Sequence, residues 1–220
     1  MAHVIAHRGA SAYALENTIE AFRLAVEMGA DGVELDVHGT RDGELVVHHD
    51  DRIQDSKISD TDLEVLLQLR LDDGTAIPTL DQALQEIGNK VTAYIEVKNL
   101  PPSHDAQLFA RIGRAPCRCQ VHSFDHRLIK RLRQQRADIE YGVLSVSILV
   151  HPQSQWLDTG ASILWQAQGF LDAQLIDAAH ADDVRVFAWT TDDASEMKEL
   201  IASGVDAICT NKPDVGKRIV

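Results

Sequence analysis

Cysteine is scarce in this sequence of 220 residues, which contains only Cys117, Cys119 and Cys209. An odd count, with two cysteines one residue apart, provides no disulfide framework and fits a reducing compartment. A C-x-C pair without a second cluster is weak evidence for a metal site. Because an unpaired cysteine behaves as a small buried hydrophobe, we expect ordinary strand and core positions for all three.

Long apolar runs are absent as well. No window approaches 18 uninterrupted apolar residues, so we expect no membrane-spanning helix. The first ten residues, MAHVIAHRGA, have no basic segment followed by a long apolar core, which argues against a signal peptide. With the cysteine usage, these features predict a soluble, cytoplasmic protein without stable membrane association.

Positive charge is in short supply. Lys and Arg number 21 against 34 Asp and Glu, so the net charge is −13. This field repels nucleic acid backbones and anionic lipid surfaces, and we expect neither as a partner. An anionic small-molecule substrate would need a bound cation or a few well-placed basic residues. The oligomeric state is left open.

The sequence also lacks linkers rich in Pro, Gly or Ser, internal repeats and biased tracts. Its composition is ordinary for a globular protein, with 45% hydrophobic and 25% charged residues. A chain of this size buries roughly 70–75% of its unfolded surface without metal or disulfide staples. We therefore expect one domain over residues 1–220.

What is present is an alternation of strand-like runs with amphipathic helical patterns. In the first helical pattern Ile19, Phe22 and Val26 share one face, and Asn17 with Glu20 is predicted to form a capping box. Nine runs are typical of strands: 3–7, 32–38, 44–49, 91–98, 119–124, 140–146, 162–165, 184–190 and 207–210.

One pair of strands breaks the alternation. Asp42-Gly43 is a strong hairpin-turn signal, so 32–38 and 44–49 should pair as a β-hairpin. Without 44–49, the second arm of this hairpin, eight strands remain, each followed by a helix or crossover, and they predict an α/β fold of the (β/α)8 barrel type. A doubly wound open sheet is the alternative. The charged stretch 50–77 is predicted to be a short excursion after strand 2, with one short helix.

Chemically active residues gather at the predicted strand ends, where barrel enzymes place their catalytic groups. Ionisable side chains at such positions are costly to bury unless they are paired or bound to metal. The strand ends carry His7-Arg8, Glu34 with Asp36, His49-Asp50, Glu96 with Lys98, Ser123 and Trp189.

Strand alternation places Glu34 and Asp36 on one face, and Glu96 and Lys98 on one face of a later strand. Three carboxylates that converge inside one ring repel each other unless a cation lies between them. Oxygen ligands suit a hard cation such as Mg²⁺ or Ca²⁺. The alternative, that each carboxylate caps a helix or pairs with Lys98 or Arg8, explains one E-x-D motif better than the whole set.

Other polar residues have plainer interpretations. His48 lies on the opposite strand face from His49 and is predicted to pack between helix and sheet. His38 lines the pocket rim or is exposed to solvent. Ser123 and Phe124 line the substrate site or, for Ser123, form a satisfied core hydroxyl. No G-x-S-x-G elbow exists, so a Ser-His-Asp triad is not supported.

Taken in order, the motifs resemble those of the glycerophosphodiester phosphodiesterase family, over about residues 3–214. The early combination of H-R-G, E-N-T, E-L-D and H-D is highly specific. The matching segments are HRGA (7–10), ENT (16–18), GVELDVHGTRDGELVVHHD (32–50), IPTL (77–80), IEVK (95–98), HSFD (122–125), FAWT (187–190) and GVDAICTNKPD (204–214).

The resemblance implies a barrel that hydrolyses glycerophosphodiesters to glycerol 3-phosphate and an alcohol, commonly with Mg²⁺ or Ca²⁺. It implies two catalytic histidines acting as acid and base in an order left open, three metal carboxylates and two phosphate-contacting basic residues. These roles fall on His7 and His49 (catalytic), Glu34, Asp36 and Glu96 (metal), and Arg8 and Lys98 (substrate).

The sequence departs from the family pattern in several places. Leu15 replaces the usual Pro before ENT. The family's W-T-V-N and T-D-x-P read here as WTTD (189–192) and TNKP (210–213), so Asp and Asn are exchanged at Asp192 and Asn211. If these two are neighbours, the exchange preserves one charge. The excursion after Asp50 is shorter than in many relatives.

Two rival functions remain. A lysophospholipase D-like relative would act on lipid substrates, but no basic amphipathic helix is present to dock on a bilayer, which favours a soluble diester. A non-catalytic barrel that binds phosphate metabolites has little need for two proton-transfer groups, which both His7 and His49 supply.

Overall fold

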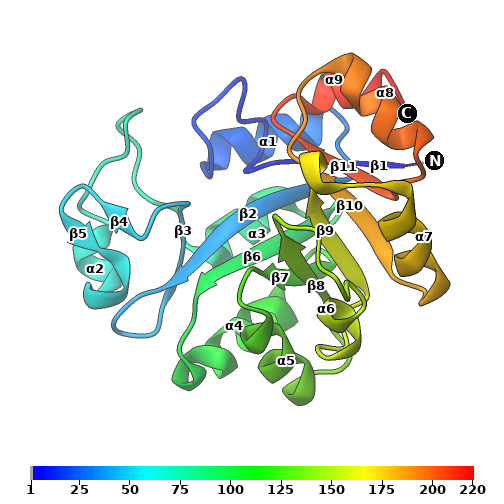
Figure 1. Cartoon of the computed structure of the whole chain (residues 1–220). Coiled ribbons are helices and arrows are strands. Elements are labelled where there is room, and N and C mark those ends of the chain that lie inside the picture. The colour runs from blue at the N-terminus through cyan, green and yellow to red at the C-terminus, as the bar shows by residue number, and fades with distance from the viewer. Residues whose placement is uncertain (1) are drawn as a thin grey trace.

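The computed structural model describes residues 2–220 and contains the predicted closed barrel. Eight parallel strands pair in the order β1-β11-β10-β9-β8-β7-β6-β2, and β2 pairs with β1 to close the ring (Figure 1). The open-sheet alternative is therefore wrong. The strands are β1 His3–Ala6, β2 Gly32–Gly39, β6 Thr92–Asn99, β7 Cys119–Ser123, β8 Glu140–Ser145, β9 Ile163–Ala167, β10 Arg185–Trp189 and β11 Ala207–Thr210.

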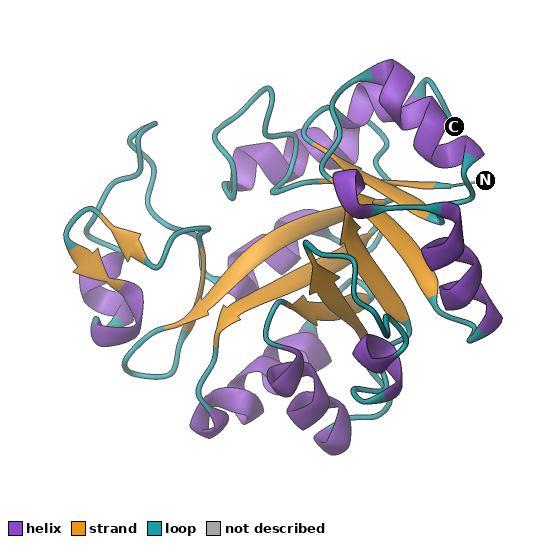
Figure 2. Ribbon diagram, viewed as in Figure 1, coloured by secondary structure: helices purple, strands orange, loops and turns teal. Residues whose placement is uncertain are grey.

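Helices connect successive strands and lie around the outside of the barrel (Figure 2). The α-helices are α1 Ile19–Glu27, α2 Leu63–Leu66, α3 Leu80–Ile87, α4 Asp105–Arg114, α5 His126–Gln135, α6 Ser154–Leu157, α7 Ala173–Ala181, α8 Ala194–Ala202 and α9 Pro213–Lys217. Short 3-10 helices are η1 Ile58–Asp60, η2 Pro102–His104 and η3 Gln168–Phe170. None of the helices in residues 2–220 has the length and hydropathy needed to cross a membrane.

The first helix begins one residue later than the capping pattern suggested. Thr18 is the N-cap of α1, and its hydroxyl accepts a hydrogen bond from the backbone N–H of Ala21. Asn17 has a positive φ of 57° and Glu20 pairs with Arg23, so the predicted capping box is wrong. The side chain of Asn17 is instead buried toward the barrel.

Strand alternation separates two layers of the core. Val33, Leu35 and Val37 of β2 face outward and belong to the large apolar layer beneath the helices. Glu34 and Asp36, the residues between them, belong to the opposite face of the strand, which points into the barrel.

Aromatic residues fill the inside of the barrel below this polar level. Tyr94, Trp165 and Phe187 pack edge to face, with ring centroids 5.0–5.8 Å apart. A Cβ at Gly32 would lie 2.2 Å from the Tyr94 ring, so glycine is required for this packing. The barrel interior is thus filled by packed aromatic side chains, and the polar groups lie above this layer.

The predicted hairpin is confirmed: β3 (Leu45–Val47) pairs antiparallel with β2, and Gly43 in the turn has a φ of 86°. The excursion follows as β4 (Arg52–Ile53), β5 (Ser56–Lys57), η1 and α2, at the left of Figure 1. Beyond the one short helix expected, it contains a small second hairpin. Its apolar residues form a minor core of Val46, Ile53, Ile58, Leu66 and Ile77.

Candidate active site

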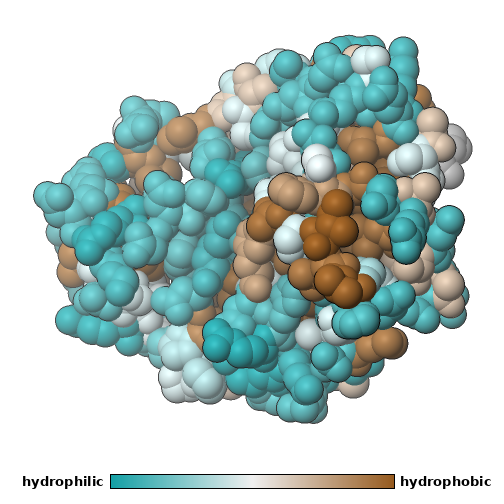
Figure 3. Space-filling model, viewed as in Figure 1, coloured by the Kyte–Doolittle hydropathy of each residue, from teal (hydrophilic) through white to brown (hydrophobic). Residues whose placement is uncertain are grey.

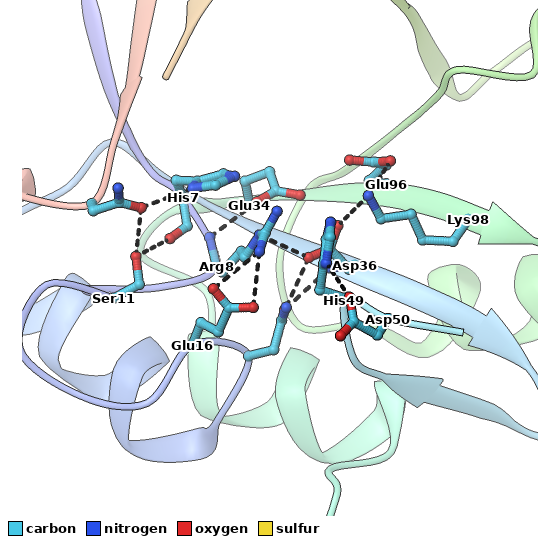
Figure 4. Close-up of polar contacts among 12 residues, drawn as sticks. His7, Arg8, Ser11, Glu16, Glu34, Asp36, His49, Asp50, Glu96 and Lys98 are labelled. Atoms are coloured by element: carbon cyan, nitrogen blue, oxygen red, sulfur yellow. Dashed lines mark hydrogen bonds and ion pairs between the residues drawn. The ribbon is translucent and has the colours of Figure 1, made fainter. Parts of the chain in front are cut away.

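A cavity of about 160 Å³ opens at the carboxyl ends of the barrel strands. Six of the seven predicted site residues line it, and the seventh, Asp36, forms ion pairs with two of them (Figure 4). A larger hollow of about 490 Å³ lies beside it, between the loop after β1 and the excursion. The smaller cavity is the candidate site because the buried carboxylates and His7 meet there.

His7 follows β1 directly and has a fixed ring orientation. Its Nδ1 lies 2.8 Å from Oδ1 of Asn211, whose amide nitrogen donates to Asp192 at 2.7 Å. Because that amide nitrogen is engaged, Asn211 presents its oxygen to His7, and Nδ1 carries the proton. Burial, followed by the neighbouring Arg8, lowers the pKa of His7. At neutral pH the ring is therefore neutral, with an unprotonated Nε2.

The exchanged residues Asp192 and Asn211 are neighbours, so the exchange preserves one charge at this place. Asp192 also accepts hydrogen bonds from the Thr210 hydroxyl and from the backbone N–H of Asn211. Although burial alone raises the pKa of Asp192, these bonds lower it overall. The negative charge thus stands one residue farther from the His7 ring than the family pattern places it.

Arg8 is held by a bidentate contact to Glu16, with Nη1 at 2.8 and 3.0 Å from the two carboxylate oxygens. Its Nε lies 3.1 Å from Asp36. The backbone of Arg8 has a φ of 56°, which is uncommon for a non-glycine residue. In this conformation its N–H donates to Glu34 at 3.0 Å.

Asp36 stays ionised at the centre of a basic environment. Burial alone raises its pKa, but Lys98, Arg8 and a hydrogen bond from Asn17 lower the pKa overall. The amide of Asn17 donates to Oδ2 of Asp36 at 2.8 Å and accepts from the Asp36 backbone N–H at 3.2 Å. Asn17 is therefore a buried clamp for Asp36.

The pKa values of Glu34 and Glu96 are raised, whereas that of Asp36 is lowered. Burial, then repulsion from Asp36 and Glu96, raises the pKa of Glu34 well above its usual value. Burial and Asp36 raise the pKa of Glu96 to about 7, despite Lys98 at 2.6 Å. Two carboxylates that resist ionisation beside an ionised third are typical of a site that needs a cation.

The buried oxygens fit a divalent ion. Ligand atoms of Glu34, Glu96 and His122 lie within 4.8 Å of one another, and Oε1 of Glu34 has no hydrogen-bond partner. Carboxylate oxygens suit Mg²⁺ or Ca²⁺, whereas an imidazole nitrogen is more typical of transition-metal sites. Asp36 lies outside this group because its oxygens face Arg8, Lys98 and Asn17.

His49 reaches the cavity from the segment after β3, and its Nδ1 lies 2.8 Å from the Asp50 carboxylate. His38 is neither at the rim nor exposed: it is buried, and its Nε2 lies 3.1 Å from the His49 carbonyl. His48 lines the larger hollow, so its predicted packing between helix and sheet is wrong. The two adjacent histidines do face different cavities.

His122 is a cavity residue that was not singled out from the sequence. His122 is fully buried and stacks on Trp165, with centroids 4.3 Å apart and planes 10° apart. His122 begins the H-S-F-D segment and lies on the same inward face of β7 as Gln120. These two features of the sequence could have identified it. Phe124 and Trp189 line the cavity, whereas Ser123 donates to the Val97 carbonyl at 2.7 Å as a satisfied core hydroxyl.

The sequence model of the glycerophosphoryl diester phosphodiesterase family matches residues 7–215. The chain belongs to this family. It is a phosphoric diester hydrolase of the glycerophosphodiester phosphodiesterase type. A glycerophosphodiester phosphodiesterase from Caldanaerobacter subterraneus subsp. tengcongensis is 33% identical, over 96% of this chain and 94% of that protein.

Solved structures of the family agree with the barrel. An Oleispira antarctica phosphodiesterase, in complex with the product sn-glycerol-3-phosphate, has a TM-score of 0.92 at 26% identity, covering 99% of this chain and 96% of that one. A glycerophosphodiester phosphodiesterase from Parabacteroides distasonis has a TM-score of 0.88 at 27% identity, with the same coverage. The expected family membership and fold are confirmed.

Proposed function

We propose that this glycerophosphodiester phosphodiesterase depends on a divalent cation and releases glycerol 3-phosphate and an alcohol. The observation that carries the proposal is the meeting of two histidines and buried carboxylates in one cavity. Burial lowers the pKa of His7. The relative solved with sn-glycerol-3-phosphate supports the glycerol 3-phosphate half of the substrate.

In this proposal His7 is the general base and His49 the general acid. The unprotonated Nε2 of His7 takes a proton from water, and the water oxygen attacks phosphorus. The bond from phosphorus to the alcohol oxygen breaks, and His49 protonates the departing alkoxide. The Asp50 carboxylate beside Nδ1 of His49 compensates the charge of an imidazolium, which suits a proton donor.

Glu34, Asp36 and Glu96 are the proposed ligands of Mg²⁺ or Ca²⁺. Glu34 and Glu96 lie close together with His122, which is near enough to take part. Asp36 would join them by giving up one of its present contacts with Lys98, Arg8 or Asn17. When bound, the cation neutralises charge on the non-bridging phosphate oxygens. Release of protons from Glu34 and Glu96 accompanies binding, because both pKa values are raised.

Arg8 and Lys98 are the proposed phosphate contacts. Both are largely buried cations that border the cavity and already balance Asp36. Because the chain carries a net charge of −13, these two groups and the cation are needed to make the pocket attractive to an anion.

A direct test is glycerol 3-phosphate release from glycerophosphocholine, glycerophosphoethanolamine and glycerophosphoglycerol, before and after EDTA. We expect turnover of at least one diester, loss with EDTA, and recovery with Mg²⁺ or Ca²⁺. Full turnover by protein that elemental analysis shows to be metal-free contradicts the cation dependence.

We also propose that residues 1–220 act as one domain, because the excursion shares its minor core with Val46 of β3. The cytoplasmic location and the exclusion of nucleic acid partners stay predictions from composition. A purely binding barrel is disfavoured because a binding role needs neither His7 nor His49 at the cavity.

A further inference from the structure

An apolar surface lies on one side of the barrel mouth, where β7, β8 and β9 end. The segment 146–150, which follows β8, contributes Ile148 and Val150, whose exposed fractions are 63% and 91%. Phe124 after β7 and Phe170 after β9 are also exposed. Figure 3 shows strongly apolar surface gathered over the segment that follows β8. We call Phe124, Val146, Ile148, Leu149, Val150 and Phe170 the apolar rim.

The apolar rim is continuous with the catalytic cavity. Phe124 belongs to both, since it lines the cavity and is 45% exposed. It packs edge to face on Trp189, another cavity residue, with centroids 5.6 Å apart. Leu144 lines the cavity two residues before Val146. One wall of the cavity is therefore apolar, and Phe124 connects it to the exposed surface.

The rim is uncharged in an otherwise acidic protein. Residues 141–150, YGVLSVSILV, contain no charged side chain, although the chain carries 55 charged residues of Lys, Arg, Asp and Glu, the sum of 21 and 34. Side chains of β8 and β9 hold the backbone of this segment. The Ser147 carbonyl accepts hydrogen bonds from the Ser145 hydroxyl at 3.2 Å and the Gln166 amide at 3.3 Å. The apolar side chains around this anchor are thus exposed on an ordered segment.

We propose that the apolar rim holds the acyl chain of a lysophospholipid substrate. This inference rests on the proposed diester hydrolysis at the same site. A glycerophosphodiester without an acyl chain has no group that would cover apolar surface, whereas one alkyl chain attached to the glycerol would gain free energy from leaving water. Water adds to phosphorus, the bond to the head-group alcohol breaks, and the products are that alcohol and a lysophosphatidate.

The test compares two substrates that differ only in the chain: lysophosphatidylcholine below its critical micelle concentration, and glycerophosphocholine, with choline release as the readout for both. The variant is Ile148→Ser combined with Val150→Ser, two exposed positions outside the catalytic machinery. The control is Val65→Ser, an exposed apolar residue of α2 on the excursion.

We expect the double variant to lose at least tenfold in kcat/KM on lysophosphatidylcholine and to stay within twofold of wild type on glycerophosphocholine. Val65→Ser should leave both values unchanged. Equal losses on both substrates, or no loss on either, overturn the assignment. So does a wild-type dimer that the double variant dissociates, because the rim would then be a subunit interface.

Failure of the rim assignment and failure of the proposed function give different results. Hydrolysis of glycerophosphocholine without hydrolysis of lysophosphatidylcholine refutes the role of the rim and leaves the proposed function intact. Hydrolysis of neither choline ester refutes the rim as a substrate site, and glycerol 3-phosphate release from other head groups then decides the proposed function separately.

Discussion

Oδ1 of Asn211 accepts a hydrogen bond from Nδ1 of His7 at 2.8 Å. Ser11 donates to the same oxygen at 2.7 Å, and the amide nitrogen of Asn211 donates to Asp192. This network selects one tautomer of His7 and leaves Nε2 as the acceptor. A neutral amide oxygen, where the family pattern places a carboxylate, keeps full negative charge away from the imidazole.

The first prediction concerns the exchanged pair. Asn211→Asp combined with Asp192→Asn places a carboxylate against Nδ1 of His7, which favours the imidazolium and raises the pKa of His7. Because the base must be neutral, the acidic limb of the kcat/KM profile should move to higher pH. Asp192→Asn alone is the control, and pH profiles that superimpose would contradict the proposed role of His7.

The second prediction concerns the acid–base pair. His7→Ala and His49→Ala should each lower kcat by about 10²–10⁴ while folding and binding metal normally. On an aryl phosphodiester with a good leaving group, His49→Ala should recover and His7→Ala should not, since only the acid becomes dispensable. His48→Ala is the matched control, because His48 faces the larger hollow. Recovery by His7→Ala instead would reverse the two assignments.

The third prediction links metal binding to pH. Burial and Asp36 raise the pKa of Glu96 to about 7, so its contribution to the stability of the metal-free protein is complete below about pH 4.5 and is lost as pH rises through 7. Metal requires the ionised carboxylate, so the increase in Tm on adding Mg²⁺ or Ca²⁺ should grow from pH 5 to pH 8. A metal-induced shift that does not change over this range would exclude Glu96 as a ligand.

The fourth prediction concerns His122. His122→Phe keeps an aromatic ring on Trp165 but removes both ring nitrogens. If His122 binds or orients the cation, affinity for Mn²⁺ measured by calorimetry should fall roughly 10- to 100-fold. The unfolding free energy of the metal-free protein serves as the control and should not fall, because burial disfavours a charged His122. Unchanged Mn²⁺ affinity would make His122 a packing residue only.

The fifth prediction concerns the Asn17 clamp. Asn17→Ala leaves the backbone N–H of Asp36 without its buried acceptor and removes one of the contacts of Oδ2, which keeps Arg8, at a cost of about 1–3 kcal/mol. Urea unfolding of the metal-free variant should show this loss. Thr18→Ala, which removes the N-cap hydroxyl instead, separates the effect of the clamp from that of helix capping. Wild-type stability of Asn17→Ala would contradict the clamp.

The sequence by itself predicted the barrel and most residues of the candidate site. Strand periodicity places Glu34 with Asp36, and Glu96 with Lys98, on inward faces because the side-chain period of a strand is fixed locally. The Asp42-Gly43 turn predicted its hairpin for the same reason: turn geometry depends on adjacent residues. His7 and Arg8 were predicted because they directly follow a strand.

Only the tertiary structure decided how these groups face one another. It placed Asn17 against Asp36 rather than at the helix cap, and Asn211 against His7 across the paired strands β11 and β1. It separated Asp36, within a basic environment, from Glu34 and Glu96, whose burial raises their pKa values. Such contacts join residues far apart in the chain, so their distances and charges depend on the closed ring, which local sequence does not encode.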